Sequence, residues 1–265
     1  MFRKILIANR GEIAVRIIRA ARELGIATVA VYSTADKEAL HTLLADEAIC
    51  IGPGKATESY LNINAILSAA VLTEAEAIHP GFGFLSENSK FATMCEEVGI
   101  KFIGPSAGVM DVMGDKINAR AQMIKANVPV IPGSDGEVHT AEEALAIAEK
   151  IGYPVMLKAS AGGGGKGIRK VEKAEDLAAA FETASSEAKA NFGNGAMYIE
   201  RVIYPARHIE VQILADQEGH VVHLGERDCS LQRNNQKVLE ESPSIAIGKT
   251  LRHEIGAAAV RAAES

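Results

Sequence analysis

Glycine and lysine residues form the strongest chemical signal in the sequence, in the segment Gly162-Gly163-Gly164-Gly165-Lys166-Gly167. Glycine has no Cβ atom, so the backbone N–H groups of such a segment can close around phosphate oxygens. Lys158, Lys166 and Arg169 lie in or beside the segment and supply positive charge for the same anion. Because glycines beyond those a turn needs cost conformational entropy without adding packing, the pattern predicts a phosphate-binding loop. The alternative is a flexible surface hairpin.

This glycine segment matches neither of the two common nucleotide-binding fingerprints. Gly162, Gly164 and Gly167 have the dinucleotide spacing, but that fingerprint requires a helix afterwards, and the run 168–171 predicts a strand. The P-loop pattern fails because Ser160 stands at its first glycine position and Gly167 at its Ser/Thr position. The segment is therefore expected to be the tip of a hairpin.

Lys158 lies inside the otherwise apolar run 155–159. A charged side chain in an apolar strand needs a partner, and nucleotide phosphates would provide one. The alternative is a lysine on an edge strand that reaches solvent.

A second polar segment, residues 226–237, contains acids, amides and arginines and ends in Lys237. Such side chains can form part of a site, and a solvated loop is the alternative. Cys229 has no histidine close by in sequence, so we do not expect it to act as a nucleophile.

Two further turns, residues 9–12 and 79–88, follow predicted strands. Turns in this position line the ligand crevice of a doubly wound sheet, and an ordinary turn is the alternative for each.

The elements that position these residues follow from hydrophobic periodicity. Short apolar runs alternate with amphipathic segments through residues 1–113, which predicts a parallel sheet covered by helices on both faces. Predicted strands are 4–8, 27–32, 48–51, 76–79 and 101–104, and predicted helices are 12–24, 60–71 and 86–98, the last opened by a capping region at 86–89.

Three further segments follow this α/β domain. Residues 114–129 form a connector, with a helix expected over 109–126. Residues 130–203 form a small α+β lobe, with helices at 141–151 and 175–190, an antiparallel hairpin of 154–158 and 168–171, and a strand at 197–203. Residues 204–265 begin a third unit, with a hairpin of 207–215 and 220–224, a polar stretch, and a helix at 249–265. Because the chain stops within that helix, we expect it to be the N-terminal portion of a longer protein.

Composition excludes several classes of protein. With 48% apolar residues, 23% charged residues and a net charge of −6, the chain is neither disordered nor a typical nucleic-acid binder. It has no apolar run long enough for a membrane span and no signal-peptide pattern, so a cytoplasmic location is expected. Three widely spaced cysteines fit reduced thiols, and neither the cysteines nor the seven histidines have metal-ligand spacing. We therefore predict no metal site from these residues.

Taken together, the ordered motifs resemble biotin carboxylase, a member of the ATP-grasp ligases. The motifs are residues 7–14, 79–88, 102–105, 113–116, 158–167, and 225–230 continuing to Gln236-Lys237. The resemblance implies a Rossmann-like N-terminal domain, a lid domain with the glycine-rich loop, and the start of an antiparallel ATP-grasp catalytic domain.

The resemblance also implies roles for individual residues. Lys116 and Lys158 would contact ATP phosphates, and Gly164 and Gly165 would fold over them. The adenine site would be lined by Glu200, Arg201, Val202 and Ile203, with polar contacts from Glu200 and Val202. His208 would reach the ribose, Gln232 would lie near the phosphate–biotin region, and Lys237 would bind bicarbonate as a catalytic residue. Asn235 stands where the family often has histidine. The asparagine would keep a polar contact with the nucleotide, but it removes a titratable group.

The implied reaction is the ATP- and bicarbonate-dependent carboxylation of biotin on a carrier protein, through carboxyphosphate, as in the first half-reaction of acetyl-CoA carboxylase in fatty acid synthesis. The implied partners are the biotin carboxyl carrier protein, the carboxyltransferase subunits and a second copy of the chain, without nucleic acid or membrane. The family's two magnesium-binding glutamates, Glu-Asn-Arg cluster and biotin-contacting arginine lie beyond residue 265. We therefore expect the 265 residues alone to be catalytically incomplete.

Three other functions are compatible with parts of the sequence. Another ATP-grasp carboxylate–amine ligase would share the nucleotide site but act without biotin. A non-catalytic module would bind nucleotide or a partner without turnover. A dehydrogenase would prefer NAD to ATP.

Overall fold

A computed structural model describes the 265-residue chain except for residues 115, 161–166 and 234–235. The side chains of residues 116, 117 and 192 are also outside the description. The chain divides into two compact units, Met1–Asp115 and Lys116–Ser265. The predicted boundaries near 129/130 and 203/204 within the second unit stay a prediction.

The first unit contains a five-stranded sheet in which every pair of neighbouring strands is parallel. Its order is β3-β2-β1-β4-β5, so the strand order reverses at β1. The strands are β1 (Lys4–Ile7), β2 (Ala27–Ser33), β3 (Glu47–Gly52), β4 (Ala77–His79) and β5 (Lys101–Phe102). Their continuous apolar runs are required because both faces of a parallel sheet are covered.

Separate apolar cores lie on the two faces of this sheet. One core includes Ile5 and Ile7 of β1 with Ile17 and Ile18 of α1 (Gly11–Glu23). The other combines alternate strand residues with α3 (Ile63–Leu72) and α4 (Ser89–Glu97). The predicted fold class is confirmed. The short helices α2 (Leu40–Leu44), η1 (Thr34–Asp36) and η2 (Ala56–Glu58) were not predicted.

Local sequence signals account for some of the helix ends. The Asn88 carboxamide accepts a hydrogen bond from the Phe91 backbone N–H at 2.8 Å, as the predicted capping region requires. The segment expected as one helix over 109–126 is helical on both sides of residue 115, and its continuity there stays a prediction. The structure has α5 (Ala107–Gly114) and α6 (Lys116–Lys125), and residue 115 between them lies outside the described residues.

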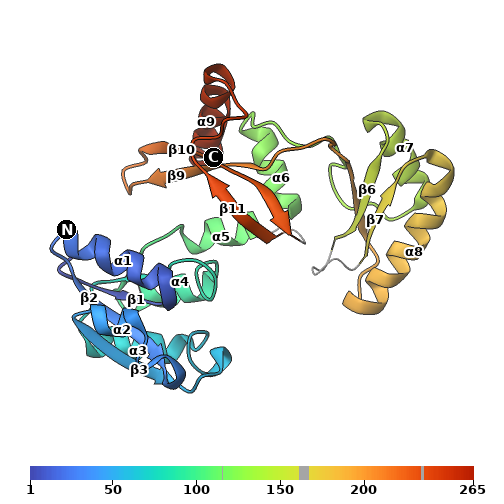
Figure 1. Ribbon diagram of the computed structural model, residues 1–265. Helices are drawn as coiled ribbons and strands as arrows, with labels where there is room; N and C mark the ends of the chain where they lie inside the picture. The colour runs from blue at the N-terminus through green and yellow to red at the C-terminus, as the bar shows by residue number, and fades with distance from the viewer. Residues whose placement is uncertain (115, 161–166, 234–235) are drawn as a thin grey trace. The chain divides into compact units, whose positions relative to one another are not determined.

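The second unit begins with α6 and a three-stranded antiparallel sheet of order β7-β6-β8. Its strands are β6 (Val155–Ala159), β7 (Ile168–Val171) and β8 (Met197–Arg201), and we call it the lid sheet. Helices α7 (Ala141–Ile151) and α8 (Ala174–Phe192) pack against one face, where Val155 and Leu157 are fully buried (Figure 1). The opposite face carries half-buried residues instead, which positions their side chains for a site.

The rest of the second unit is an antiparallel sheet of order β11-β10-β9 with helix α9 (Lys249–Glu264). The strands are β9 (Ile209–Ala215), β10 (Val221–Arg233) and β11 (Gln236–Glu241). The interpretation of residues 226–237 as a solvated loop is wrong, because β10 extends to Arg233. Several of its polar residues have side-chain partners, as where Arg252 donates to the buried Glu226 carboxylate at 2.7 Å.

In the part of the chain that the structure describes, none of the helices has both the length and the apolar character needed to cross a membrane.

Candidate functional site

Lys158, Tyr198 and Glu200 form a polar cluster on the open face of the lid sheet. Lys158 on β6 is directly opposite Tyr198 on β8, and Glu200 is two residues further along β8. Because side chains alternate between the faces of a strand, all three project away from the buried core. β6 is the central strand of the sheet, so the alternative of an edge-strand lysine is contradicted.

The Glu200 carboxylate is held from both sides. Lys158 forms an ion pair with its Oε1 atom, and the Tyr198 hydroxyl donates a hydrogen bond to its Oε2 atom at 3.0 Å. The Lys158 ammonium also lies 5.7 Å from the centroid of the Tyr198 ring. Burial, followed by the nearby Glu200 charge, raises the pKa of Tyr198 to about 12. Tyr198 therefore remains a hydrogen-bond donor at neutral pH.

Strand β8 ends at Arg201, one residue after Glu200, and backbone hydrogen bonds tie the end of the strand to neighbouring segments. The N–H groups of Arg201 and Val202 donate to the carbonyls of Pro132 and Pro154, both at 2.8 Å. The Ile203 side chain is 49% exposed. The structure therefore brings the four residues expected around an adenine, 200–203, to one end of the lid sheet.

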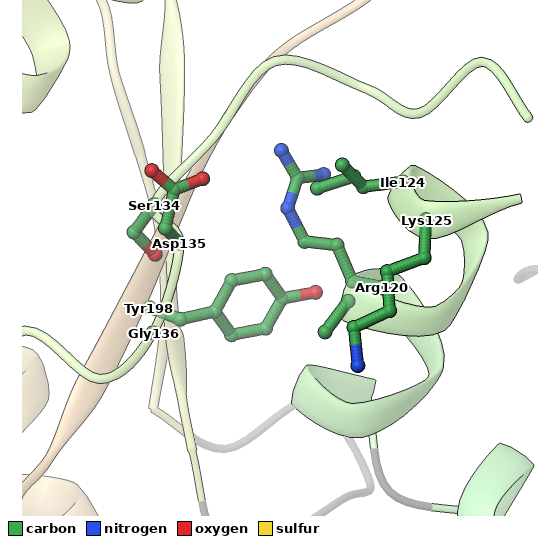
Figure 2. Close-up of a pocket in the computed structure, with 8 residues that line it drawn as sticks. Arg120, Ile124, Lys125, Ser134, Asp135, Gly136 and Tyr198 are labelled. Atoms are coloured by element: carbon green, nitrogen blue, oxygen red, sulfur yellow. The ribbon is translucent and has the colours of Figure 1, made fainter. Parts of the chain in front are cut away.

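A pocket with a volume of about 390 Å³ lies between α6 and the edge of the lid sheet. Figure 2 shows the Tyr198 ring projecting into it toward Arg120 and Lys125 of α6. Ser134 and Asp135 line the opposite side. Arg120 donates from Nη1 to the Ile131 carbonyl at 2.5 Å, which ties α6 to the segment leading into the lid. Tyr198 thus borders both this pocket and the Glu200 cluster.

A second polar cluster lies on the β11-β10-β9 sheet around Glu210. Arg227 donates from Nε to its Oε1 atom at 2.6 Å, and Lys237 pairs with its Oε2 atom. The hydrogen bond from Lys237 and then that from Arg227 lower the pKa of Glu210 to about 2 against the cost of burial, and Glu210 in turn raises the pKa of Lys237. Lys237 is therefore held as a cation, suited to binding an anion rather than to accepting a proton.

His208 and Gln232 contact each other beside this cluster. The Gln232 amide donates to His208 Nδ1 at 2.7 Å and to the Cys229 carbonyl at 2.9 Å. The neutral His208 ring then carries its proton on Nε2, where it can donate to a ligand oxygen. Burial, followed by the Glu210 and Glu240 charges, raises the pKa of the Cys229 thiol and so disfavours its thiolate form.

Several predicted site residues cannot be placed. Gly164, Gly165 and Asn235 lie outside the described residues, as does the Lys116 side chain at the start of α6. The predicted phosphate-binding loop therefore stays a prediction. Among the described residues, sequence reasoning missed Tyr198, Glu210 and Arg227. The alternation of side chains along a strand could have indicated Tyr198 and Glu210. Tyr198 lies two residues from Glu200 and Glu210 two residues from His208, so each shares a strand face with a predicted site residue.

The two turns expected at the crevice of the first unit contact each other through Asn9. This buried side chain donates hydrogen bonds to the carbonyls of Pro80 and Phe82 at 2.7 and 2.8 Å. Gly81, between them, has φ +63°, and a Cβ atom there would lie 2.8 Å from Asn9 Nδ2. These contacts give Asn9 a structural role in joining the ends of β1 and β4.

Two groups of described residues have ligand atoms close enough to hold a metal ion: Glu210, Cys229 and Glu240, and Asp216, Glu218 and His220. In the first, Glu210 is already neutralised by Lys237 and Arg227, which does not suit a divalent cation. The second is an exposed turn between β9 and β10, where the His220 ring lies 2.8 Å from Asp216. Neither group is assigned a metal.

Two family models match the chain. The model described as biotin carboxylase, N-terminal domain, matches residues 1–110. The model described as carbamoyl-phosphate synthase L chain, ATP binding domain, matches residues 115–265.

Individual relatives match along the full chain. The curated biotin carboxylase 1 of Bacillus subtilis (strain 168) is 57% identical over 265 residues, which are 100% of this chain and 59% of that protein. The biotin carboxylase–beta-gamma-ATP complex from Campylobacter jejuni has a TM-score of 0.88 and 53% identity, covering 100% of this chain and 59% of that one.

A third match is the biotin carboxylase domain dimer of the Hydrogenobacter thermophilus 2-oxoglutarate carboxylase, solved with MgADP, ADP and bicarbonate. It has a TM-score of 0.85 and 51% identity, covering 100% of this chain and 58% of that one. The chain thus spans about three fifths of the length of the relatives it matches.

Proposed function

Because the chain belongs to the biotin carboxylase family, we propose that it carries the ATP-binding part of a ligase that joins the carboxyl group of bicarbonate to carrier-bound biotin. The observation that carries this proposal is the Lys158–Tyr198–Glu200 cluster on the open face of the lid sheet.

This cluster has the polarity that an adenine nucleotide requires. Lys158 supplies a cation for phosphate oxygens, and Glu200 supplies a hydrogen-bond acceptor for an exocyclic amino group. Met156 and Ile168 lie opposite Glu200 and Lys158 across the sheet, at the same face, and offer an apolar surface for a purine ring. Lys116, Gly164, Gly165 and Asn235 are proposed as further nucleotide contacts on the basis of the resemblance alone.

The residues after Glu200 and those on β9 and β10 complete the proposed nucleotide site. Arg201, Val202 and Ile203 would line the base through their backbone and apolar atoms. His208, with its proton on Nε2, would donate to a ribose hydroxyl. Gln232, which fixes the His208 ring, would lie next to the phosphates.

Lys237 is proposed to bind bicarbonate. Lys237 and Arg227 both form ion pairs with Glu210, which holds the Lys237 ammonium in place. An anion that binds beside Lys237 would therefore be stabilised by a positive charge that is already positioned. Solved relatives include one described with bicarbonate and MgADP. Magnesium, when bound, would offset phosphate charge, and no group among the described residues is assigned to hold it.

The proposed reaction begins when a bicarbonate oxygen attacks the γ-phosphorus of ATP. The bond from that phosphorus to the β–γ bridging oxygen breaks, which releases ADP and forms carboxyphosphate. Carboxyphosphate then breaks into CO₂ and phosphate, phosphate takes the proton of the biotin ureido nitrogen, and that nitrogen bonds to CO₂. Lys158 and Lys237 would act by positioning and by neutralising charge, on which phosphoryl transfer depends.

The finer assignments of partners are also proposals. A biotin carboxyl carrier protein would deliver the substrate, carboxyltransferase subunits would use the product, and two copies of the chain would form a homodimer. A relative described as a dimer supports the last of these.

The experiment that tests this function measures nucleotide binding by titration calorimetry, and ADP formation with bicarbonate in the presence and absence of biotin. We expect ATP to bind, NAD not to bind, and any ADP formation to require biotin. ADP formation that needs an amino acid or purine precursor, and not biotin, would assign the chain to another group of ATP-grasp ligases. Binding of NAD in preference to ATP would reject the proposal altogether.

A further inference from the structure

Tyr198 is the member of the lid-sheet cluster that neither the sequence motifs nor the proposed reaction uses. Its hydroxyl donates to Glu200 Oε2 at 3.0 Å, and its ring borders the pocket beside α6. Both Tyr198 and Glu200 are half-buried, so their hydrogen bond is partly shielded from water.

The arrangement leaves Glu200 with a defined set of free acceptor positions. A carboxylate has about four lone-pair positions, two on each oxygen. Among the described residues, Lys158 occupies one on Oε1 and Tyr198 one on Oε2, which fixes the plane of the carboxylate and leaves one position on each oxygen. Without the Tyr198 bond, Lys158 would be the one described residue that restrains rotation about the last side-chain torsion of Glu200.

We propose that Tyr198 is a positioning residue that orients the Glu200 carboxylate to accept a hydrogen bond from the 6-amino group of adenine, and that it thereby sets the preference for adenine nucleotides. This inference rests on the proposed function and extends it from ATP binding to base selection. A 6-oxo purine presents an acceptor at that place, which an oriented carboxylate repels, and a purine with hydrogen at C6 makes no contact there.

The pocket supports a positioning role rather than one in packing alone. Figure 2 shows the Tyr198 hydroxyl at the far end of a ring that enters the pocket, with the Arg120 and Lys125 side chains around it. The hydroxyl is therefore not needed to fill space in the lid core, which α7 and α8 cover from the other face. Its defined protein contact is the Glu200 carboxylate.

Tyr198→Phe is the informative variant, because it keeps the ring and removes only the hydroxyl. Tyr153→Phe is the matched control, since the Tyr153 hydroxyl is buried in the same unit and has no hydrogen-bond partner among the residues described. Dissociation constants would be measured by calorimetry for ATP, inosine triphosphate and purine riboside triphosphate, which carry amino, oxo and hydrogen substituents at C6.

We expect the unmodified chain and Tyr153→Phe to bind ATP at least about tenfold more tightly than purine riboside triphosphate, as a hydrogen bond to a charged group predicts. In Tyr198→Phe this ratio should fall to about threefold or less, with the affinity for purine riboside triphosphate unchanged. Selection against inosine triphosphate should weaken in parallel. A merely structural role would lower all three affinities together and leave the ratios unchanged.

The double variant Glu200→Ala/Tyr198→Phe shows whether Tyr198 acts through Glu200. Its ratio should equal that of Glu200→Ala, because the tyrosine then has nothing to orient. An unchanged ratio in Tyr198→Phe would overturn the inference while the proposed nucleotide site stands. Equal affinity of the unmodified chain for ATP and purine riboside triphosphate, or no binding of either, would overturn the base-reading role of Glu200 and the inference with it.

Discussion

The Lys237 ammonium on β11 reaches across strand β10 to the Glu210 carboxylate on β9. The ion pair therefore joins two strands that are not neighbours in the sheet. Arg227, from the strand between them, donates to the same carboxylate. The three side chains place a fixed negative charge between two cations, which explains why the pKa of Glu210 is low and that of Lys237 is raised.

Replacing Glu210 should change how stability depends on pH. The pKa of Glu210 is about 2 in the folded chain against an ordinary 4.5, so its stabilisation is complete above about pH 4.5 and is lost as the pH falls toward 2. We expect Glu210→Gln to lower the free energy of unfolding by about 1–2 kcal/mol at pH 7 and by less at pH 3. Urea denaturation at both pH values would measure this.

Glu254→Gln is the matched control for that experiment, because Glu254 is an exposed carboxylate on α9 in the same unit. It should change the unfolding free energy by less than about 0.5 kcal/mol at either pH. Equal losses for Glu210→Gln at pH 7 and pH 3 would contradict the low pKa assigned to Glu210.

Lys158→Ala should weaken ATP binding through the loss of a phosphate contact. A charge-assisted contact contributes about 1.5–3 kcal/mol, so the dissociation constant should rise about 10- to 150-fold. Lys150→Ala removes an exposed lysine from α7 in the same unit and should leave the constant within about twofold. Calorimetric titration of both variants would test this, and equal affinities would count against the phosphate role of Lys158.

Gly81→Ala should destabilise the first unit more than Gly83→Ala. Both glycines have positive φ, +63° and +68°, so both variants carry a backbone cost of about 1–2 kcal/mol. Only at Gly81 would the new Cβ meet Asn9, 2.8 Å from its Nδ2 atom, whereas nothing lies within 4 Å at Gly83. We expect an additional loss of about 1–2 kcal/mol for Gly81→Ala. Equal urea midpoints for the two variants would show that Asn9 moves aside freely.

Asp36→Asn should destabilise the first unit because the buried Asp36 carboxylate accepts hydrogen bonds from several side chains. Its carboxylate accepts hydrogen bonds from Arg10 Nε at 2.8 Å, from the Tyr60 hydroxyl at 2.7 Å and from the Ser33 hydroxyl at 3.0 Å. The Arg10 hydrogen bond is the largest cause that holds the pKa of Asp36 well below its usual range. We expect a loss of about 2–4 kcal/mol in urea denaturation at pH 7.

Asp111→Asn provides the comparison for Asp36→Asn, since Asp111 is exposed on α5. A change of less than about 0.5 kcal/mol is expected there. A loss for Asp36→Asn no larger than that for Asp111→Asn would mean that Arg10 and Tyr60 find equivalent partners in solvent.

The alternation of apolar runs and amphipathic segments in the sequence was sufficient to predict the parallel sheet of the first unit. The three inner strands β1, β2 and β4 are largely buried on both faces, so most of their residues are apolar whatever their partners are. The helix α7 and the strand β7 were predicted with the bounds observed. The ends of α7 are marked locally, because Thr140 caps its first turn and Gly152 follows its last residue. The order of the motifs along the chain was also sufficient to identify the family.

Only the tertiary structure decided which polar side chains meet. Lys158 and Glu200 are separated by 42 residues, and Lys237 and Glu210 by 27, so no local spacing could join them. The extent of β10 was missed for the same reason. Several of its polar residues pair with other elements, as Arg227 does with Glu210 on β9 and Glu226 with Arg252 on α9, and such a strand does not show apolar alternation. Hydrophobic periodicity in the sequence indicates which residues are buried. A polar site instead depends on contacts between side chains of different elements, and only folding brings those elements together.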